Sequence, residues 1–158
     1  MNKNTKPTRD SRYGRCQCGT VHFRAPLVPL SFYACHCTDC RAQSASAFGL
    51  SYLIRPDDFF LVSGKLKTYL QSDAESMQKL AAFCGDCGTR VHHASTDPSQ
   101  LISIKAGALV DISDLTPIAH IWTDSALPWV DFSSGGVRCF NTQPREEQLI
   151  SLWGNQPT

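Results

Sequence analysis

Three short segments contain seven of the eight cysteines: Cys16-Gln17-Cys18-Gly19, Cys35-His36-Cys37-Thr38-Asp39-Cys40-Arg41 and Cys84-Gly85-Asp86-Cys87-Gly88. Cysteine pairs at these spacings suit a shared metal ion better than a disulfide framework. The first and third segments each end in glycine, which permits the positive φ and the close backbone approach of a metal-binding turn. The cysteines therefore predict a fold in which metal sites pin loops together.

The clustered thiols divide into two sets with different chemistry. Four thiolates close a tetrahedral structural zinc site, and the two glycine-ended segments supply a four-cysteine group: Cys16, Cys18, Cys84 and Cys87. Three thiolates leave one position open for water or a substrate, and the middle segment supplies a three-cysteine group: Cys35, Cys37 and Cys40. The sequence thus predicts two zinc ions, one structural and one catalytic. Iron in the four-cysteine group, or two separate buried thiol pairs, are the alternatives there.

Composition excludes several classes of protein. A length of 158 residues indicates one domain, and 15 basic against 14 acidic residues give a net charge of +1. This balance offers no electrostatic basis for binding nucleic acid or an anionic membrane. No apolar run approaches the roughly 20 residues of a membrane-spanning helix. The polar N-terminus has no secretory signal, so we expect a cytoplasmic protein whose thiols stay reduced.

Short strands dominate the sequence pattern. Alternating or continuous apolar residues bounded by turn signals predict strands at residues 21–24, 48–54, 65–70, 78–83, 89–93, 102–106 and 117–123. Helix is the minor component, with a turn or two expected within 38–46 or 144–152. We therefore expect a mainly β domain of short antiparallel sheets with zinc-pinned loops. It spans residues 13–132, after a flexible lead (1–12) and before an irregular tail (133–158).

Three residues of the middle segment are considered for roles beside the metal. Arg41 is expected to offset the charge of a three-thiolate site or to bind a substrate carboxylate, and an ordinary surface arginine is the alternative. His36 faces away from the cysteines if the segment is extended, so we expect a hydrogen-bonding neighbour rather than a ligand. Asp39 is expected to face solvent.

The ordered motifs Cys-x-Cys-Gly, Cys-His-Cys-x-x-Cys-Arg and Phe-Cys-x-x-Cys-Gly-Thr resemble the glutathione-dependent formaldehyde-activating enzyme family, also called the centromere protein V family. The resemblance covers about residues 13–132 and extends to residues 46–49, 107–109, 117–121 and 127–129. It implies an Mss4-like β-tent fold and a carbon–sulfur lyase that joins formaldehyde to glutathione as S-hydroxymethylglutathione, or reverses that step. The three-cysteine group is then catalytic and the four-cysteine group structural. His120 matches the histidine of the family's Pro-x-x-His-Ile motif.

Two positions depart from the family pattern. Ala126 stands where a basic residue is common, and Ala45 stands where a glycine often occurs. Both lie near segments expected to frame the substrate opening, so a thiol other than glutathione competes as the substrate.

The resulting functional hypothesis is a zinc-dependent carbon–sulfur lyase acting on glutathione-like thiol adducts of formaldehyde or a related small electrophile. Its catalytic candidates are Cys35, Cys37, Cys40, Arg41, His36 and His120. A non-catalytic zinc-binding module that serves a protein partner is the alternative, and thiol-dependent dehalogenation is a third reading of the same site. The oligomeric state is left open, with a homodimer among the options.

Overall fold

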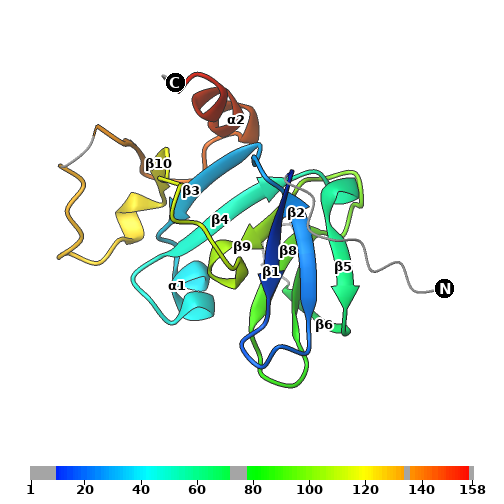
Figure 1. Cartoon of the computed structure of the whole chain (residues 1–158). Coiled ribbons are helices and arrows are strands. Elements are labelled where there is room, and N and C mark those ends of the chain that lie inside the picture. Colours follow the sequence, from blue (N-terminus) through cyan, green and yellow to red (C-terminus); the bar gives the residue numbers. More distant parts are fainter. Residues whose placement is uncertain (1–9, 72–77, 134–135, 157–158) are drawn as a thin grey trace.

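The computed structural model describes residues 10–71, 78–133 and 136–156. Over these residues it contains eleven strands and two α-helices, which confirms the predicted mainly β fold (Figure 1). The small sheet has the strand order β1-β2-β5, and the large sheet has the order β11-β10-β3-β4-β9-β8-β7-β6.

The strands of the small sheet are β1 (Ser11–Arg15), β2 (His22–Pro26) and β5 (Phe60–Ser63). Those of the large sheet are β3 (Ser31–Cys35), β4 (Gly49–Ile54), β6 (Leu66–Gln71), β7 (Lys79–Cys84), β8 (Arg90–Ser95), β9 (Ile102–Lys105), β10 (Ala119–Ile121) and β11 (Arg138–Phe140). The α-helices are α1 (Thr38–Ser44) and α2 (Glu146–Gly154). Short 3-10 helices follow β4, β9 and β10: η1 (Pro56–Asp58), η2 (Ala106–Ala108) and η3 (Thr123–Ser125).

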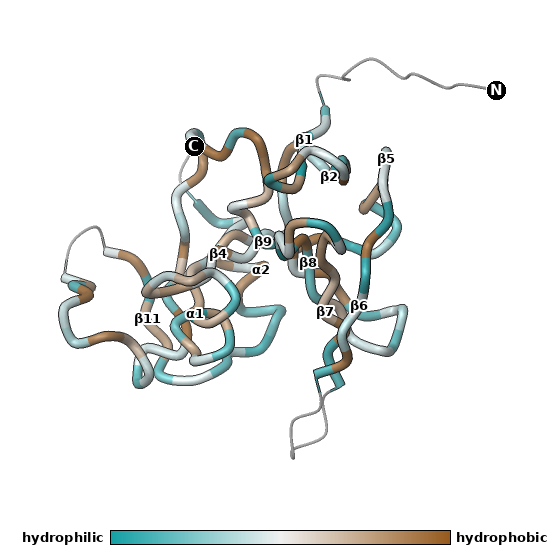
Figure 2. Tube along the Cα trace, turned by 90° about the horizontal axis from the view of Figure 1, so that it is seen from below, coloured by the Kyte–Doolittle hydropathy of each residue, from teal (hydrophilic) through white to brown (hydrophobic). Residues whose placement is uncertain are grey.

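Buried side chains of both sheets form the larger of two hydrophobic clusters. In β2, buried and more exposed residues alternate, as the sequence pattern predicts. The Phe23 ring stacks on Phe59 with centroids 5.4 Å apart, and its cluster includes Val91 and Ile104 of the large sheet. Figure 2 shows hydrophobic residues on β8 and its neighbours inside the molecule and hydrophilic residues mostly on the outer loops. The two sheets are therefore held together by apolar burial between them.

The middle cysteine segment lies where β3 ends and α1 begins. β3 is buried along its whole length and pairs antiparallel with β4. Most strand pairs are antiparallel, as predicted, but β10 runs parallel to both β3 and β11. Parallel neighbours need long connections, so no local turn pattern announces them. This pairing sets His120 opposite Ala34, one residue before the first cysteine of the three-cysteine group.

The C-terminal segment, expected to be an irregular tail over 133–158, is instead built into the fold. β11 joins the large sheet beside β10, and α2 packs on β3 (Figure 1). Leu149 of α2 is fully buried, and the Ser31 hydroxyl donates to the Leu149 carbonyl at 3.0 Å. A helix of 9 residues with one buried side chain gives a weak periodic signal. The helical turn indicated within 144–152 is confirmed there.

The N-terminal boundary also differs from the expected flexible lead over 1–12. Residues 1–9 lie outside the described residues, but Ser11 and Arg12 pair with β2 in β1. The Arg12 guanidinium donates to the Asp114 carboxylate at 2.6 Å and to the Asp111 carbonyl at 2.8 Å. The ordered structure therefore begins before residue 13.

The contribution of α2 to stability can be tested with Leu149→Ala. We expect this change to lower the free energy of unfolding by about 2–5 kcal/mol, because it opens a cavity at a fully buried position. The matched control is Leu70→Ala, since Leu70 is 45% exposed and its loss should cost only about 0.5 kcal/mol. Urea unfolding of both variants measures the difference. Equal losses would contradict the assignment of α2 to the core.

Candidate metal centres

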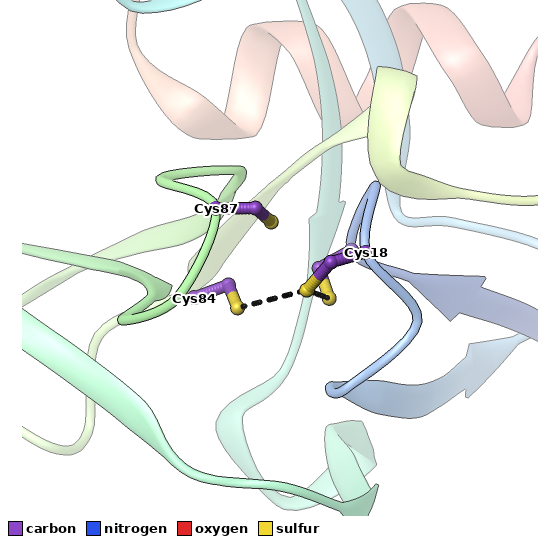
Figure 3. A group of neighbouring side chains, drawn as sticks. Cys18, Cys84 and Cys87 are labelled. Carbon is purple, nitrogen blue, oxygen red and sulfur yellow. Dashed lines mark hydrogen bonds between the residues drawn. The ribbon is translucent and has the colours of Figure 1, made fainter.

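The four-cysteine group is formed by two turns that come from different sheets. Cys16 and Cys18 lie in the turn between β1 and β2, whereas Cys84 and Cys87 lie at the turn between β7 and β8. Figure 3 shows the sulfurs of the labelled residues facing one another across the gap between these turns. The Cys16 and Cys18 sulfurs are 3.4 Å apart, and the Cys18 and Cys84 sulfurs 3.8 Å. All four lie within 4.8 Å of one another.

The two turns have the same backbone construction. In the first, the Gly19 amide donates to the Cys16 carbonyl at 3.1 Å; in the second, the Gly88 amide donates to the Cys84 carbonyl at 3.0 Å. Both glycines have positive φ, +81° and +74°. Residues with a side chain rarely adopt this backbone conformation. The structure therefore confirms that the two glycines permit a positive φ in these turns, as expected from the sequence.

The geometry of the four-cysteine group fits a tetrahedral ion. Zinc–sulfur bonds of about 2.3 Å place tetrahedral sulfurs roughly 3.8 Å apart, close to the separation of the Cys18 and Cys84 sulfurs. Hydrogen bonds from the Thr89 side chain and backbone lower the pKa of Cys87 to about 5, which favours its thiolate. These four residues can therefore hold a metal ion and close its coordination sphere.

The three-cysteine group is assembled at the junction of β3 and α1. Cys35 ends β3, Cys37 is the N-cap of α1, and Cys40 lies in its first turn. The Cys37 sulfur accepts a hydrogen bond from the Cys40 amide at 3.4 Å and lies 3.5 Å from the Cys35 sulfur. The three sulfurs are within 4.8 Å of one another. The end of the strand and the cap of the helix together bring three sulfur atoms from six consecutive residues close to one another.

The electrostatics of the three-cysteine group are compatible with a bound cation. Hydrogen bonds from Cys35 and Cys37, with help from Lys105, lower the pKa of Cys40 to about 2. The same crowding by Cys37 and Cys40 raises the pKa of Cys35. Adjacent thiolates repel one another, so one sulfur is stabilised as thiolate at the expense of its neighbour. A bound divalent ion removes this conflict, because each ligand can then be ionised.

His36 and His120 were separate candidates in the sequence, and the structure brings them together. The His36 Nε2 and His120 Nδ1 atoms are 2.8 Å apart. Phe48 and Phe132 pack against the pair, with ring centroids 5.2 Å and 5.0 Å from His36 and His120 respectively. Burial, then the charge of His120, lowers the pKa of His36 to about 4; burial also lowers the pKa of His120. Both imidazoles are therefore neutral near pH 7.

Arg41 and Asp39 were both considered as possible surface residues, and each forms a hydrogen bond with another segment of the chain. The Arg41 guanidinium donates to the Ser125 carbonyl of η3 at 3.1 Å, which ties α1 to that segment. Asp39 does not simply face solvent, because its carboxylate accepts a hydrogen bond from the Gln71 amide at 2.5 Å. Both side chains thus have structural partners beside the three-cysteine group.

The family's glycine position has a conformational explanation. Ala45, which stands where a glycine often occurs, is the C-cap of α1 and has φ +48°. This left-handed conformation favours glycine, so a backbone requirement accounts for the common residue without any contact to a substrate.

Sequence reasoning missed two cationic residues beside the cysteines. Lys105 is only 9% exposed, and its Nζ lies 3.7 Å from the Cys40 sulfur. Arg90 begins β8, three residues after Cys87, and lines the same cavity as Lys105. Neither residue belongs to one of the cysteine motifs that indicate a metal site. The available signal was weak: a lysine in a strand between isoleucine and alanine, and an arginine after a cysteine turn.

One cavity of about 360 Å³ adjoins both cysteine groups. Its lining includes Cys40 from the three-cysteine group and Cys87 from the four-cysteine group, with Lys105, Arg90 and Gln43 as long polar side chains. This volume lies at the lower end of the range for small-molecule sites. The cavity can therefore admit a small ligand next to the Cys40 sulfur.

Fold and sites together define a mainly β protein with one group of four cysteines and one group of three, each of which could hold a metal ion. Residues 11–125 match the glutathione-dependent formaldehyde-activating enzyme family, and the chain belongs to this family. The predicted family and the mainly β fold are thereby confirmed. Among relatives, an uncharacterized lyase of Schizosaccharomyces pombe is 25% identical over 122 residues, 77% of this chain and 85% of that protein.

A solved structure supports the fold assignment. The crystal structure of a Rhodobacter sphaeroides protein aligns with a TM-score of 0.50 at 20% identity, over 81% of this chain and 98% of that one. In the part of this chain that the structure describes, no helix is both long and apolar enough to cross a membrane.

Proposed function

We propose that this protein is a zinc-dependent carbon–sulfur lyase acting on adducts of a small thiol with formaldehyde or a related electrophile. The observation that carries the proposal is the open three-cysteine group beside a cavity, in a chain whose second cysteine group is closed. Family membership and the lyase-named relative support the same reaction class. Glutathione is the first substrate to test, and a cytoplasmic location stays a prediction.

In the proposed site, Cys35, Cys37 and Cys40 hold one zinc ion, and the four-cysteine group holds a second, structural one. Zinc bound by three thiolates would lower the pKa of a substrate thiol and so favour its reactive thiolate form. Zinc that is bound by soft thiolate ligands also binds a sulfur atom as its further ligand more readily than it binds a carboxylate.

The chemistry adds a thiol across an aldehyde carbonyl. The sulfur forms a bond to the aldehyde carbon, the carbon–oxygen double bond becomes single, and the thiol proton ends on that oxygen. The reverse reaction breaks the carbon–sulfur bond and returns the aldehyde. We assign proton transfer to the neutral pair of His36 and His120, because a neutral imidazole accepts a proton at one nitrogen while its partner donates at another. Arg41 serves as a positioning residue that fixes the loop around η3.

Thiol binding tests this proposal directly. We expect glutathione or a simpler thiol to bind the two-zinc protein with release of about one proton near pH 7, because a thiol must be deprotonated before it can act as a metal ligand. Calorimetry in buffers of different ionisation enthalpy counts that proton. A cobalt-substituted protein should also change its absorption spectrum when thiol is added. Failure of every thiol to bind would favour the non-catalytic zinc module instead.

A further inference from the structure

Strand β5 forms an exposed edge of the small sheet. It pairs with β2 on one side, and among the described residues no strand pairs with its other side. Figure 1 shows β5 on the outside of the molecule. An edge strand presents a row of backbone N–H and C=O groups to which another strand can pair. The outer side of β5 is therefore open to a further strand.

The side chains of β5 are more apolar than those of a protected edge strand. Phe60, Leu61 and Val62 are consecutive and are 53%, 44% and 55% exposed. A run of exposed apolar residues is a mark of an interaction surface. Proteins protect free edges with charged residues, proline or irregular pairing. A register shift leaves Val62 without a counterpart in β2, but no residue of β5 is charged or proline.

The charges on either side of β5 indicate which chain can cover it. Asp57 and Asp58 precede the strand, and Lys65 and Lys67 follow it, whereas Arg55 lies beyond the 3-10 helix η1. Asp57 and both lysines are exposed, and Asp58 is half-buried. Within the described residues, none of these four side chains forms an ion pair or a hydrogen bond. The edge thus has an acidic end, an apolar middle and a basic end.

A second copy of the chain is complementary to this pattern. In an antiparallel pair of β5 strands related by a two-fold axis, the apolar middle of each strand packs against that of the other. The same symmetry places the acidic end of each strand beside the basic end of its partner, so opposite charges meet at both ends. A uniformly acidic or uniformly basic segment would be repelled at one end. The charges therefore favour pairing of the edge with itself.

We propose that the protein forms a two-fold homodimer in which the outer edges of two β5 strands pair antiparallel and join the two small sheets into one continuous sheet. This inference is independent of the proposed lyase activity, because β5 contributes no residue to either cysteine group. It selects the homodimer among the oligomeric states that the sequence leaves open.

Sedimentation equilibrium of the full chain with zinc, between about 1 and 200 µM, tests the dimer. Wild type should change from the mass of one chain to twice that mass within this range, as expected for a modest interface. Val62→Lys should weaken the dimer at least about 100-fold, because it places like charges near the two-fold axis and protects the edge. The matched control Val110→Lys changes a valine that is 63% exposed outside β5 and should dimerise like the wild type.

Circular dichroism verifies that both lysine variants are folded. A wild-type protein that stays monomeric over the whole range would overturn the proposal, and so would a Val62→Lys variant that dimerises as tightly as the wild type.

Charge reversal tests the antiparallel pairing separately and leaves the apolar residues intact. Asp57→Lys and Lys65→Asp should each weaken the dimer about 10-fold, because each sets like charges beside one another at both ends of the paired strands. The double variant restores opposite charges and should return to within about threefold of the wild-type dissociation constant. The matched control Asp124→Lys changes an exposed residue of η3, after β10 and on the side of the molecule away from β5 (Figure 1). It should leave dimerisation unchanged.

The charge-reversal variants and the dependence of mass on concentration also exclude other arrangements. A double variant as weak as the single ones would overturn the antiparallel pairing. Pairing of β5 with β6, the edge strand of the large sheet, would be heterologous and would extend from copy to copy. Growth beyond the dimer with rising concentration would therefore overturn the two-fold arrangement.

Discussion

Replacing Cys84 with serine is expected to unfold the domain under conditions in which the wild-type protein is stable. Cys84 is 1% exposed and belongs to the closed group that joins two turns. Structural zinc contributes roughly 10–16 kcal/mol of apparent binding free energy in small metal-dependent folds. A loss of even about 5 kcal/mol would remove most of the stability of an ordinary domain.

Urea unfolding and zinc analysis of Cys84→Ser measure this effect. The matched control is Cys139→Ser, because Cys139 is exposed and lies outside both metal groups. The control should retain two zinc ions and the wild-type midpoint. A Cys84 variant with an unchanged midpoint would show that the four-cysteine group is not a structural centre.

Replacing Cys37 with serine should have the opposite effect on folding and on thiol binding. The protein should stay folded with one zinc ion, and its affinity for thiols should be at least about 100-fold weaker than that of the wild type. The chain should tolerate the change because Cys37 is the N-cap of α1, where its sulfur accepts from the Cys40 amide. Serine is among the preferred N-cap residues and can accept the same hydrogen bond. Removing one of three ligands nevertheless leaves too few to hold the second ion firmly.

Circular dichroism, metal analysis and thiol titration of Cys37→Ser separate fold from function. Elemental analysis of the wild type provides the reference, with two zinc ions per chain and the second more easily removed by a chelator. If the Cys37 variant unfolds as readily as the Cys84 variant, the division into structural and catalytic centres is wrong.

The two cysteine groups were predictable because their signal is local. Each pair or triplet of cysteines is close in the chain, and the glycines of the first and third segments report the turn conformation directly. The alternating strand at 21–24 and the continuous one at 48–54 were visible for a similar reason, because side-chain period follows the backbone.

The rest of the site depends on contacts that no local pattern contains. His36 meets His120 only because β10 pairs in parallel with β3 across 84 residues of sequence. Lys105 reaches Cys40 from β9, 65 residues away. Arg90 lines the cavity that adjoins both cysteine groups, a position that its place in the sequence does not indicate. Lys105 and Arg90 belong to no motif in the sequence, and only the strand topology brings them to the cavity beside Cys40.

The four-cysteine group also has a consequence for how the molecule opens. Its sulfurs join positions 66 residues apart, so an ion there acts as a cross-link that closes a long loop and binds both sheets at one end. Neither the β1–β2 hairpin nor the β7–β8 hairpin can detach there without losing ligands. With an ion bound, the two hairpins would therefore unfold locally as one cooperative unit. Arg90 lies at the start of β8 in the second hairpin and lines the cavity beside Cys40, so an ion in the four-cysteine group would also limit the motion of that lining.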